Sequence, residues 1–387
     1  MNGPLRAYLG LTTAAMLAAC NVRGGENHST PLAFKSASPT TIHLETPTST
    51  PTFAPTRTRF PRPPAGVYIA FTVVTGLQGD TPIRQLSIKA ASSAEVYVLA
   101  RDIYSGSVSP DGRLALFFKA DGLHAMSLLS GSQEAVTGSG TELSLQPRIC
   151  APLEWSRSSA IAASICGAPF ADYSLLFFNP ADGTLRQTPL PLACFDFDLS
   201  SDGITLLATC FDPDRGDVVA AIPTDGAPPA VLSCPQGLIC NRPKLSPDGR
   251  YIAFFSGEGR SGVPSMPFGI FIRETTCLTQ TSNCSSPTQG PIAESEHWAW
   301  SPDASLIAFI DDQGRLAIYD LAPKTTQFIG QTGITAHAIE WSPDGEWIAV
   351  ATDSDISLFS PDGTTRKTVA SGELIELAGW ATFAQEK

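Results

Sequence analysis

Residues 67–387 alternate between short apolar runs and a recurring polar turn signature. The signature is Ser-Pro-Asp-Gly or a variant of it, and an apolar residue stands directly before each copy. Its copies begin at Ser109, Ser156, Ser200, Ser246, Ser301 and Ser342, of which the second and third are divergent. An apolar run follows each copy, at 114–118, 160–165, 204–208, 251–255, 306–310 and 347–350. Runs this short, bounded by turn residues, predict β-strands.

The signature suits a tight link between two antiparallel strands. Proline presets φ at the second turn position, aspartate favours turn conformations, and glycine adopts positive φ without strain. The apolar residue before the signature therefore ends a first strand, and the run after it forms a second, buried strand. Third strands are expected at 123–129, 173–178, 218–222, 269–273, 315–319 and 356–359, and the chain contains no long amphipathic helical pattern.

The two ends of the repeat array complement each other. Residues 62–71 align without gaps on residues 245–254, so the chain enters the array at a second strand, and Trp380 matches Trp341 in a first strand. From position 63 to position 381 the repeats are spaced by 46, 47, 44, 46, 55, 41 and 39 residues. The predicted fold class is all-β: a seven-bladed β-propeller of four-stranded antiparallel blades, closed by three N-terminal strands plus one C-terminal strand. A six-bladed ring is the alternative.

The Ser-Pro-Asp-Gly-x-x-Ile-Ala-Phe pattern resembles the TolB-type, WD-like propeller repeat over nearly all of residues 63–387. This resemblance implies the fold and leaves the function open, because such repeats serve many roles. The chain departs from TolB in counting seven units instead of six. It also has a polar segment where TolB has an α/β domain, so the resemblance does not imply a TolB role in envelope translocation.

Residues 1–19 are expected to be a signal peptide. Arg6 precedes an apolar stretch from Ala7 to Met16 that is too short to span a bilayer. The following Leu17-Ala18-Ala19-Cys20 resembles the lipobox of bacterial lipoproteins. This resemblance implies that Cys20 is lipidated, becomes the first residue after cleavage and anchors the chain to a membrane. An ordinary secretory signal is the alternative.

Residues 20–66 are expected to form a disordered tether between the lipidated cysteine and the propeller, which occupies residues 67–387. Thr, Pro and Ser dominate residues 39–58, and such a composition cannot bury a core. The chain's net charge of −12 divides into +1 for residues 1–19, +3 for 20–66 and −16 for 67–387. The acidic body argues against nucleic acid as a partner, because phosphates would be repelled.

The eight cysteines other than Cys20 predict disulfides in an extracytoplasmic protein. Two pairs flank their hairpin turns in the same way, six residues before and ten after the repeat serine, and this symmetry predicts Cys150–Cys166 and Cys194–Cys210. The remaining cysteines are expected to pair as Cys234–Cys240 and Cys277–Cys284. A metal site built from cysteines is the alternative, although the chain lacks a Cys-x-x-Cys motif.

Candidate ligand-binding residues stand two positions before the repeat serines. Glu154, Asp198, Lys244 and Glu340 occupy this position in four repeats, beside a Trp or Leu that is expected to be buried. Because side chains alternate along a strand, the charged residues are expected to line the central channel. There they could hold a cation or a polar ligand, or they could simply be hydrated. Of the histidines, His124 is expected on a strand surface, and His297 and His337 near the channel.

The sequence contains no nucleophile elbow, zinc-protease motif or phosphate-binding glycine loop. We therefore expect no catalytic residues and no cofactor. The leading hypothesis is a monomeric, non-catalytic envelope lipoprotein that presents the propeller to a protein or glycan partner. The alternative is a hydrolase or lyase with an acidic site at the channel mouth, which could depend on a metal.

Overall fold

The computed structural model describes residues 63–136, 150, 153–166, 173–190, 193–214, 216–225, 227–233, 238–258, 269–278, 291–333 and 336–385. All of the described residues belong to one compact unit. The expected signal peptide, the lipidation site Cys20 and residues 20–62 of the tether therefore lie outside the described residues. In the described part of the chain, no helix has the length and apolar character needed to cross a membrane.

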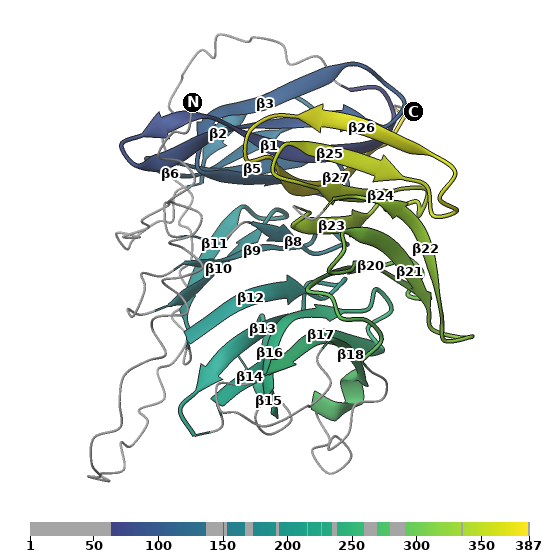
Figure 1. Cartoon of the computed structure of the whole chain (residues 1–387). Coiled ribbons are helices and arrows are strands. Elements are labelled where there is room, and N and C mark those ends of the chain that lie inside the picture. Colours follow the sequence, from purple (N-terminus) through teal and green to yellow (C-terminus); the bar gives the residue numbers. More distant parts are fainter. Residues whose placement is uncertain are drawn as a thin grey trace, which may run out of the picture. The chain divides into compact units, whose positions relative to one another are not determined.

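Seven antiparallel sheets form the blades, which we number in chain order (Figure 1). Each blade is given from its inner to its outer strand. Blade 1 contains β27 (Glu376–Phe383), β1 (Gly66–Gln78), β2 (Thr81–Ala90) and β3 (Val96–Ile103); blade 2 contains β4 (Ser105–Val108), β5 (Leu114–Lys119), β6 (Gly122–Ser127) and β7 (Gln133–Ala135); blade 3 contains β8 (Glu154–Trp155), β9 (Ala162–Cys166), β10 (Ser174–Asn179) and β11 (Thr184–Pro189); blade 4 contains β12 (Ala193–Leu199), β13 (Thr205–Asp212), β14 (Gly216–Pro223) and β15 (Ala230–Ser233). Blade 5 contains β16 (Leu238–Leu245), β17 (Tyr251–Glu258) and β18 (Gly269–Glu274); blade 6 contains β19 (His297–Trp300), β20 (Leu306–Ile310), β21 (Arg315–Asp320) and β22 (Thr325–Gln331); blade 7 contains β23 (Ala338–Trp341), β24 (Ile348–Ala351), β25 (Asp355–Phe359) and β26 (Arg366–Ser371).

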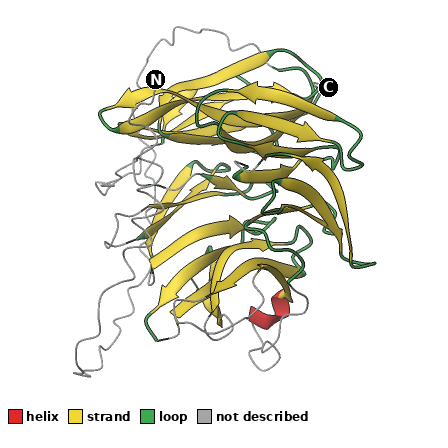
Figure 2. Cartoon of the chain, in the orientation of Figure 1, coloured by secondary structure: helices red, strands yellow, loops and turns green. Residues whose placement is uncertain are grey.

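This architecture confirms the all-β, seven-bladed propeller and excludes the six-bladed alternative. Strands account for nearly all of the regular structure, and the one helical turn drawn in Figure 2 is the 3-10 helix Thr275–Leu278. Six blades have four strands each, and blade 5 has three within the described residues. The segment that follows its third strand, 279–290, lies outside them.

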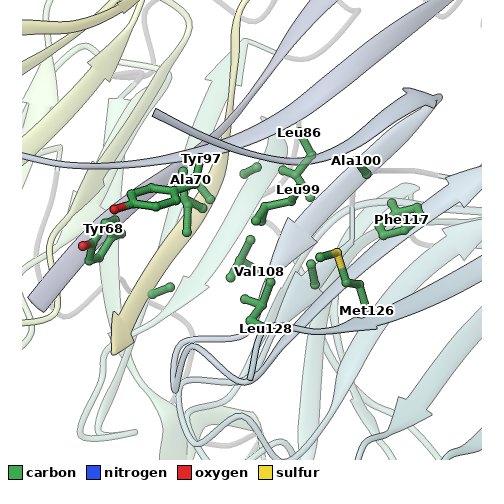
Figure 3. Packing of buried hydrophobic residues seen from close by; sticks show 14 of the residues in the cluster. Tyr68, Ala70, Leu86, Tyr97, Leu99, Ala100, Val108, Phe117, Met126 and Leu128 are labelled. Atoms are coloured by element: carbon green, nitrogen blue, oxygen red, sulfur yellow. The ribbon is translucent and has the colours of Figure 1, made fainter. Parts of the chain in front are cut away.

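Blade 1 closes the ring as the sequence predicts. The inner strand β27 pairs antiparallel with β1, with Val67 opposite Thr382 and Ile69 opposite Trp380. Seven clusters of buried hydrophobic residues lie between neighbouring blades, one for each pair, including the pair formed by blades 7 and 1. Figure 3 shows the cluster between blades 1 and 2, where Leu86 and Leu99 lie near Val108 and Leu128. The ring is therefore stabilised by burial of apolar side chains between every two blades.

The Ser-Pro-Asp-Gly turns share one hydrogen-bond pattern. In the turn that begins at Ser246, the serine Oγ donates to Asp248 Oδ1 at 2.6 Å and accepts from the Tyr251 N–H at 2.9 Å. Gly249, with φ at 71°, donates its N–H to the Ser246 carbonyl at 2.8 Å. The same serine contacts recur in the turns that begin at Ser109, Ser200, Ser301 and Ser342. The serine thus satisfies backbone and carboxylate groups that the turn would otherwise leave unpaired.

Hydrogen bonds also link the turns of neighbouring blades. Four described links are Thr382 N–H to the Pro110 carbonyl at 2.8 Å, Asp111 N–H to Ser159 Oγ at 3.0 Å, Ser158 N–H to the Ser201 carbonyl at 2.9 Å and Ser201 Oγ to the Pro247 carbonyl at 2.9 Å. Two of these links use the hydroxyls of Ser159 and Ser201, which stand in the two divergent copies where the consensus has Gly and Pro. These two departures from the consensus therefore supply contacts between blades.

Two of the four predicted disulfides are observed. Cys150 bonds to Cys166 and Cys194 bonds to Cys210. In each pair the two residues are directly opposed antiparallel partners, and their Cα atoms lie 4.0 Å apart. Cys240 is also disulfide-bonded, and its expected partner Cys234 lies outside the described residues. Cys284 lies outside them as well, and so does the side chain of Cys277. The Cys277–Cys284 pair remains a prediction.

Candidate functional site

Four inner strands present a charged residue next to their last apolar residue. These are Glu154 on β8, Asp198 on β12, Lys244 on β16 and Glu340 on β23. Each precedes a Trp or Leu whose side chain packs against hydrophobic neighbours in a cluster between blades or is buried. Side chains alternate along a strand, so each charged residue lies on the face of its strand opposite to that Trp or Leu. The same position holds Ser107, Ala299 and Gly379 in blades 2, 6 and 1, so blades 3, 4, 5 and 7 carry the charge.

The charged residues from different blades influence one another's ionisation. Burial among the inner strands, together with the charges of Glu340 and Asp198, raises the pKa of Glu154 to about 8, although solvent still reaches the side chain. Burial also raises the pKa values of Asp198 and Glu340, and Lys244 opposes both shifts. The structure therefore brings the four predicted residues into one electrostatic environment. Whether they bind a ligand is a separate question.

Arg157 joins this group, although the sequence pattern did not single it out. It occupies the proline position of the divergent turn Ser156-Arg157-Ser158-Ser159. Burial lowers the pKa of Arg157, and the carboxylates of Asp198 and Glu340 oppose that shift. The sequence signal that could have identified Arg157 is a charged residue at a turn position where the consensus signature has proline. We call Glu154, Arg157, Asp198, Lys244 and Glu340 the axial cluster.

Two bulges shape the inner strands next to the axial cluster. Asp196 on β12 and Arg242 on β16 both have left-handed backbones, with φ at 47° and 54°, where the register of each strand shifts. Both residues stand four positions before their repeat serine. This equivalence is visible in the sequence, but the search for charged residues two positions before the serine did not include it. A bulge changes the direction in which a side chain points, and bulges often occur beside functional sites. Burial raises the pKa of Asp196, and Arg242 and Lys244 oppose that shift.

The axial cluster is charged but not internally paired. Among its five described side chains, none forms an ion pair within 4.0 Å. Among hydrogen bonds between described residues, the cluster's side chains take part only through Asp198, whose Oδ2 accepts from the Leu245 N–H at 2.9 Å. Glu154 and Arg157 are exposed and the other three side chains are half-buried, so each charge keeps contact with solvent. Such groups can hydrogen-bond to a polar ligand that enters the ring.

The histidines divide into two structural situations. His297 accepts a hydrogen bond at Nδ1 from Arg242 Nη1 at 3.0 Å, and burial together with the charge of Arg242 lowers the pKa of His297 to about 4.

His124 lies on a third strand as expected, but the expectation of a surface position was wrong. Its side chain is buried, stacked on Phe117 at 5.8 Å between ring centroids and hydrogen-bonded to Asp121. His124 is buried because it packs against the neighbouring strand, and the alternation of side chains along its own strand could not predict that contact.

A metal centre is not assembled in the described part of the chain. No group of three or more His, Cys, Asp or Glu side chains there is arranged to hold a metal ion. The axial carboxylates are accompanied by two cations, Lys244 and Arg157, which would repel a metal. The donor set therefore suits organic ligands with several polar groups better than a bare cation.

Comparisons with known proteins support the fold. No family model matches the chain, and no curated protein matches it. Among solved structures, oligogalacturonate lyase from Vibrio parahaemolyticus is 12% identical with a TM-score of 0.54, covering 78% of this chain and 90% of that chain. Hydrazine synthase from Kuenenia stuttgartiensis is 14% identical with a TM-score of 0.51, covering 73% and 92%. TolB from Acinetobacter baumannii is 14% identical, with a TM-score of 0.49 and coverage of 81% and 82%.

These similarities concern architecture alone. At 12–14% identity they show a shared propeller fold, and the TM-score for TolB is too low to carry an argument. The named proteins have unrelated activities, as expected for a fold that serves many functions. Function must therefore be argued from the residues of this chain.

Proposed function

We propose that this protein is a non-catalytic, lipid-anchored extracytoplasmic protein whose propeller binds a polar part of a protein or glycan partner at the axial cluster. The observation that carries this proposal is the set of five charged side chains, drawn from four blades, that form no ion pairs with one another. Disulfides support an extracytoplasmic location, since they persist in oxidising compartments. The lipobox-like leader supports the anchor.

The charge balance of the axial cluster indicates the chemistry of the ligand. Three carboxyl groups accompany only two cations, and Glu154 is mostly protonated near pH 7 because burial, and then the charges of Glu340 and Asp198, raise its pKa to about 8. A ligand with an ammonium or guanidinium group would supply the missing positive charge and allow Glu154 to ionise. Hydroxyl or carboxylate groups on the same ligand would match Lys244 and Arg157. Amino sugars and mixed-charge peptides fit this description.

Calorimetric titration of the full-length protein in detergent tests the proposal. The probes are chitosan oligosaccharides and peptides that contain both Lys and Glu. Binding should release protons at pH 7, so the apparent enthalpy should differ between phosphate and Tris buffers. The Glu154→Gln and Asp198→Asn double variant should lose at least tenfold in affinity, while Glu134→Gln on the outer strand β7 should bind like the wild type. Equal binding by the double variant would remove the axial cluster from consideration.

Acid–base catalysis is the second candidate, and one observation favours it. Glu154 has a pKa of about 8 and would be protonated at neutral pH, and burial also raises the pKa values of Asp198 and Glu340, whose charges act on Glu154. A carboxyl group with a raised pKa serves as the general acid in glycoside-cleaving enzymes, beside a second carboxyl group. Incubation with a panel of oligosaccharides distinguishes the candidates. Turnover that is abolished in Glu154→Gln and declines above pH 8 would establish an enzyme, and binding without turnover would reject one.

A further inference from the structure

A separate pocket of about 290 Å³ opens between blades 5 and 6. Its walls come from the connection that precedes β19, from the turn between β20 and β21, and from the connection between β22 and β23. All three connect strands at the edge of the blades opposite to the Ser-Pro-Asp-Gly turns. The axial cluster lies next to those turns, so this pocket belongs to the other end of the propeller.

The pocket has an apolar floor. Phe255, Ile310 and Ala336 line it, and each is less than 10% exposed. These side chains belong to the clusters that join blade 5 to blade 6 and blade 6 to blade 7. The floor is therefore rigid and pre-formed, which reduces the entropic cost of binding there.

The rim of the pocket carries unpaired carboxylates. Glu294, Glu296 and Asp312 are exposed, and among the described residues their carboxylates accept no hydrogen bond and form no ion pair. Asp311 differs, because Arg315 Nε donates to its Oδ2 at 2.7 Å. After this pair is set aside, the rim has a surplus of three negative charges.

Arg242 offsets only one of these three charges. It donates to the Glu296 carbonyl at 3.3 Å and to His297 Nδ1 at 3.0 Å, and among the described residues it forms no ion pair with a rim carboxylate, so the rim keeps a net negative charge. His297 stays neutral at pH 7, because burial and Arg242 lower its pKa to about 4. Arg242 therefore orients the connection that carries Glu294 and Glu296.

We propose that this pocket receives a lysine or arginine side chain presented by a partner polypeptide. The aliphatic stem of such a side chain would lie on Phe255, Ile310 and Ala336, and its charged head would meet the carboxylates at the rim. The volume is at the small end of ligand pockets, which suits one long side chain. The inference goes beyond the axial cluster and does not depend on it.

Saturation-transfer NMR on the full-length protein at about 20 mM salt tests this proposal. The probes are the peptides Gly-Ser-X-Ser-Gly, in which X is lysine, norleucine or diaminopropionic acid. Lysine supplies both stem and charge, norleucine only the stem, and diaminopropionic acid only the charge. The lysine peptide should receive saturation on its side-chain methylenes and bind at least threefold more tightly than either of the others.

Protein variants complete the test. The Glu294→Gln and Glu296→Gln double variant should weaken binding of the lysine peptide at least fivefold, while Glu134→Gln should not change it. Glu154→Gln should retain this binding even if it abolishes binding at the axial cluster, so failures of the two proposals are distinguishable. Equal binding of the lysine and diaminopropionic acid peptides would indicate diffuse attraction and overturn the proposal. Butylamine that binds as tightly as the lysine peptide would also overturn it, in favour of a site for free amines.

Discussion

The buried serine of the turn signature should contribute more to stability than the same serine in an exposed turn. Blade 7 contains both cases: Ser342 begins the turn between β23 and β24, and Ser360 begins the turn between β25 and β26. In both turns the serine Oγ donates to the aspartate two residues later at 2.5 Å and accepts from a backbone N–H five residues later at 2.9 Å. The turns differ in burial, because Ser342 is 0% exposed and Ser360 is only half-buried. In the Ser360 turn, Thr364 Oγ1 also donates to Asp362, at 2.9 Å to Oδ1. Ser342→Ala and Ser360→Ala therefore compare a buried turn with an exposed turn that has one additional side-chain donor.

The expected magnitudes follow from these contacts. Each lost hydrogen bond costs about 1 kcal/mol net, and a buried group left without a partner costs a further 1–3 kcal/mol. In Ser342→Ala no water can replace the hydroxyl without opening a cavity, so the Trp347 N–H and the Asp344 carboxylate both lose a partner. We expect a loss of about 2–3 kcal/mol for Ser342→Ala. Water can replace the hydroxyl of Ser360, so Ser360→Ala should cost about 0.5–1 kcal/mol.

Urea unfolding measures this difference. Tryptophan fluorescence includes a signal from blade 7, since Trp341 and Trp347, two of the six tryptophans, flank the first turn. Circular dichroism at 215 nm should give the same midpoint if unfolding is cooperative. Ser342→Ala should lower the midpoint clearly more than Ser360→Ala, with similar slopes. Equal shifts for the two variants, or a loss below about 0.5 kcal/mol for Ser342→Ala, would refute the reasoning that burial gives the turn serine its effect.

Three further predictions concern the disulfides, the axial charge and the ring closure. Replacing Cys194 and Cys210 by alanine should cost about 3 kcal/mol in urea unfolding, because the pair closes a loop with a sequence separation of 16; an unchanged midpoint would contradict this. Because folding raises the pKa of Glu154 from 4.5 to about 8, the folded state binds more protons in that window, and stability should fall as the pH rises through it. Glu154→Gln should flatten this decline, and parallel pH profiles would count against the shift. Deleting residues 376–383 removes the inner strand of blade 1 and should give aggregated protein on gel filtration, whereas deleting 386–387 should leave a folded monomer.

The architecture was accessible from the sequence because each repeat carries its own local signal. The turn signature marks the end of six of the seven inner strands, and residues such as Val108 and Trp300 end those strands in the structure as predicted. Spacing from the repeat serine was enough to predict Cys150–Cys166 and Cys194–Cys210, because a hairpin fixes which residues face each other. Local hydrogen bonding and strand alternation are encoded residue by residue, so they survive in the divergent repeats.

Other features depend on neighbours that are distant in the chain. Arg157 belongs to the axial cluster only because blades 4 and 7 bring Asp198 and Glu340 close to it. The burial of His124 and the pocket above Phe255 likewise arise where separate strands and connections pack together.

The sequence by itself determined the blade count, the strand order and the point of closure, since each depends on contacts within one hairpin or on counting repeats. Only the tertiary structure decided which charges share one environment and which carboxylates stand unpaired beside an apolar floor. The physical reason is that pKa shifts, desolvation and pocket shape depend on groups arriving from several blades, and no local pattern in one repeat specifies what its neighbours bring.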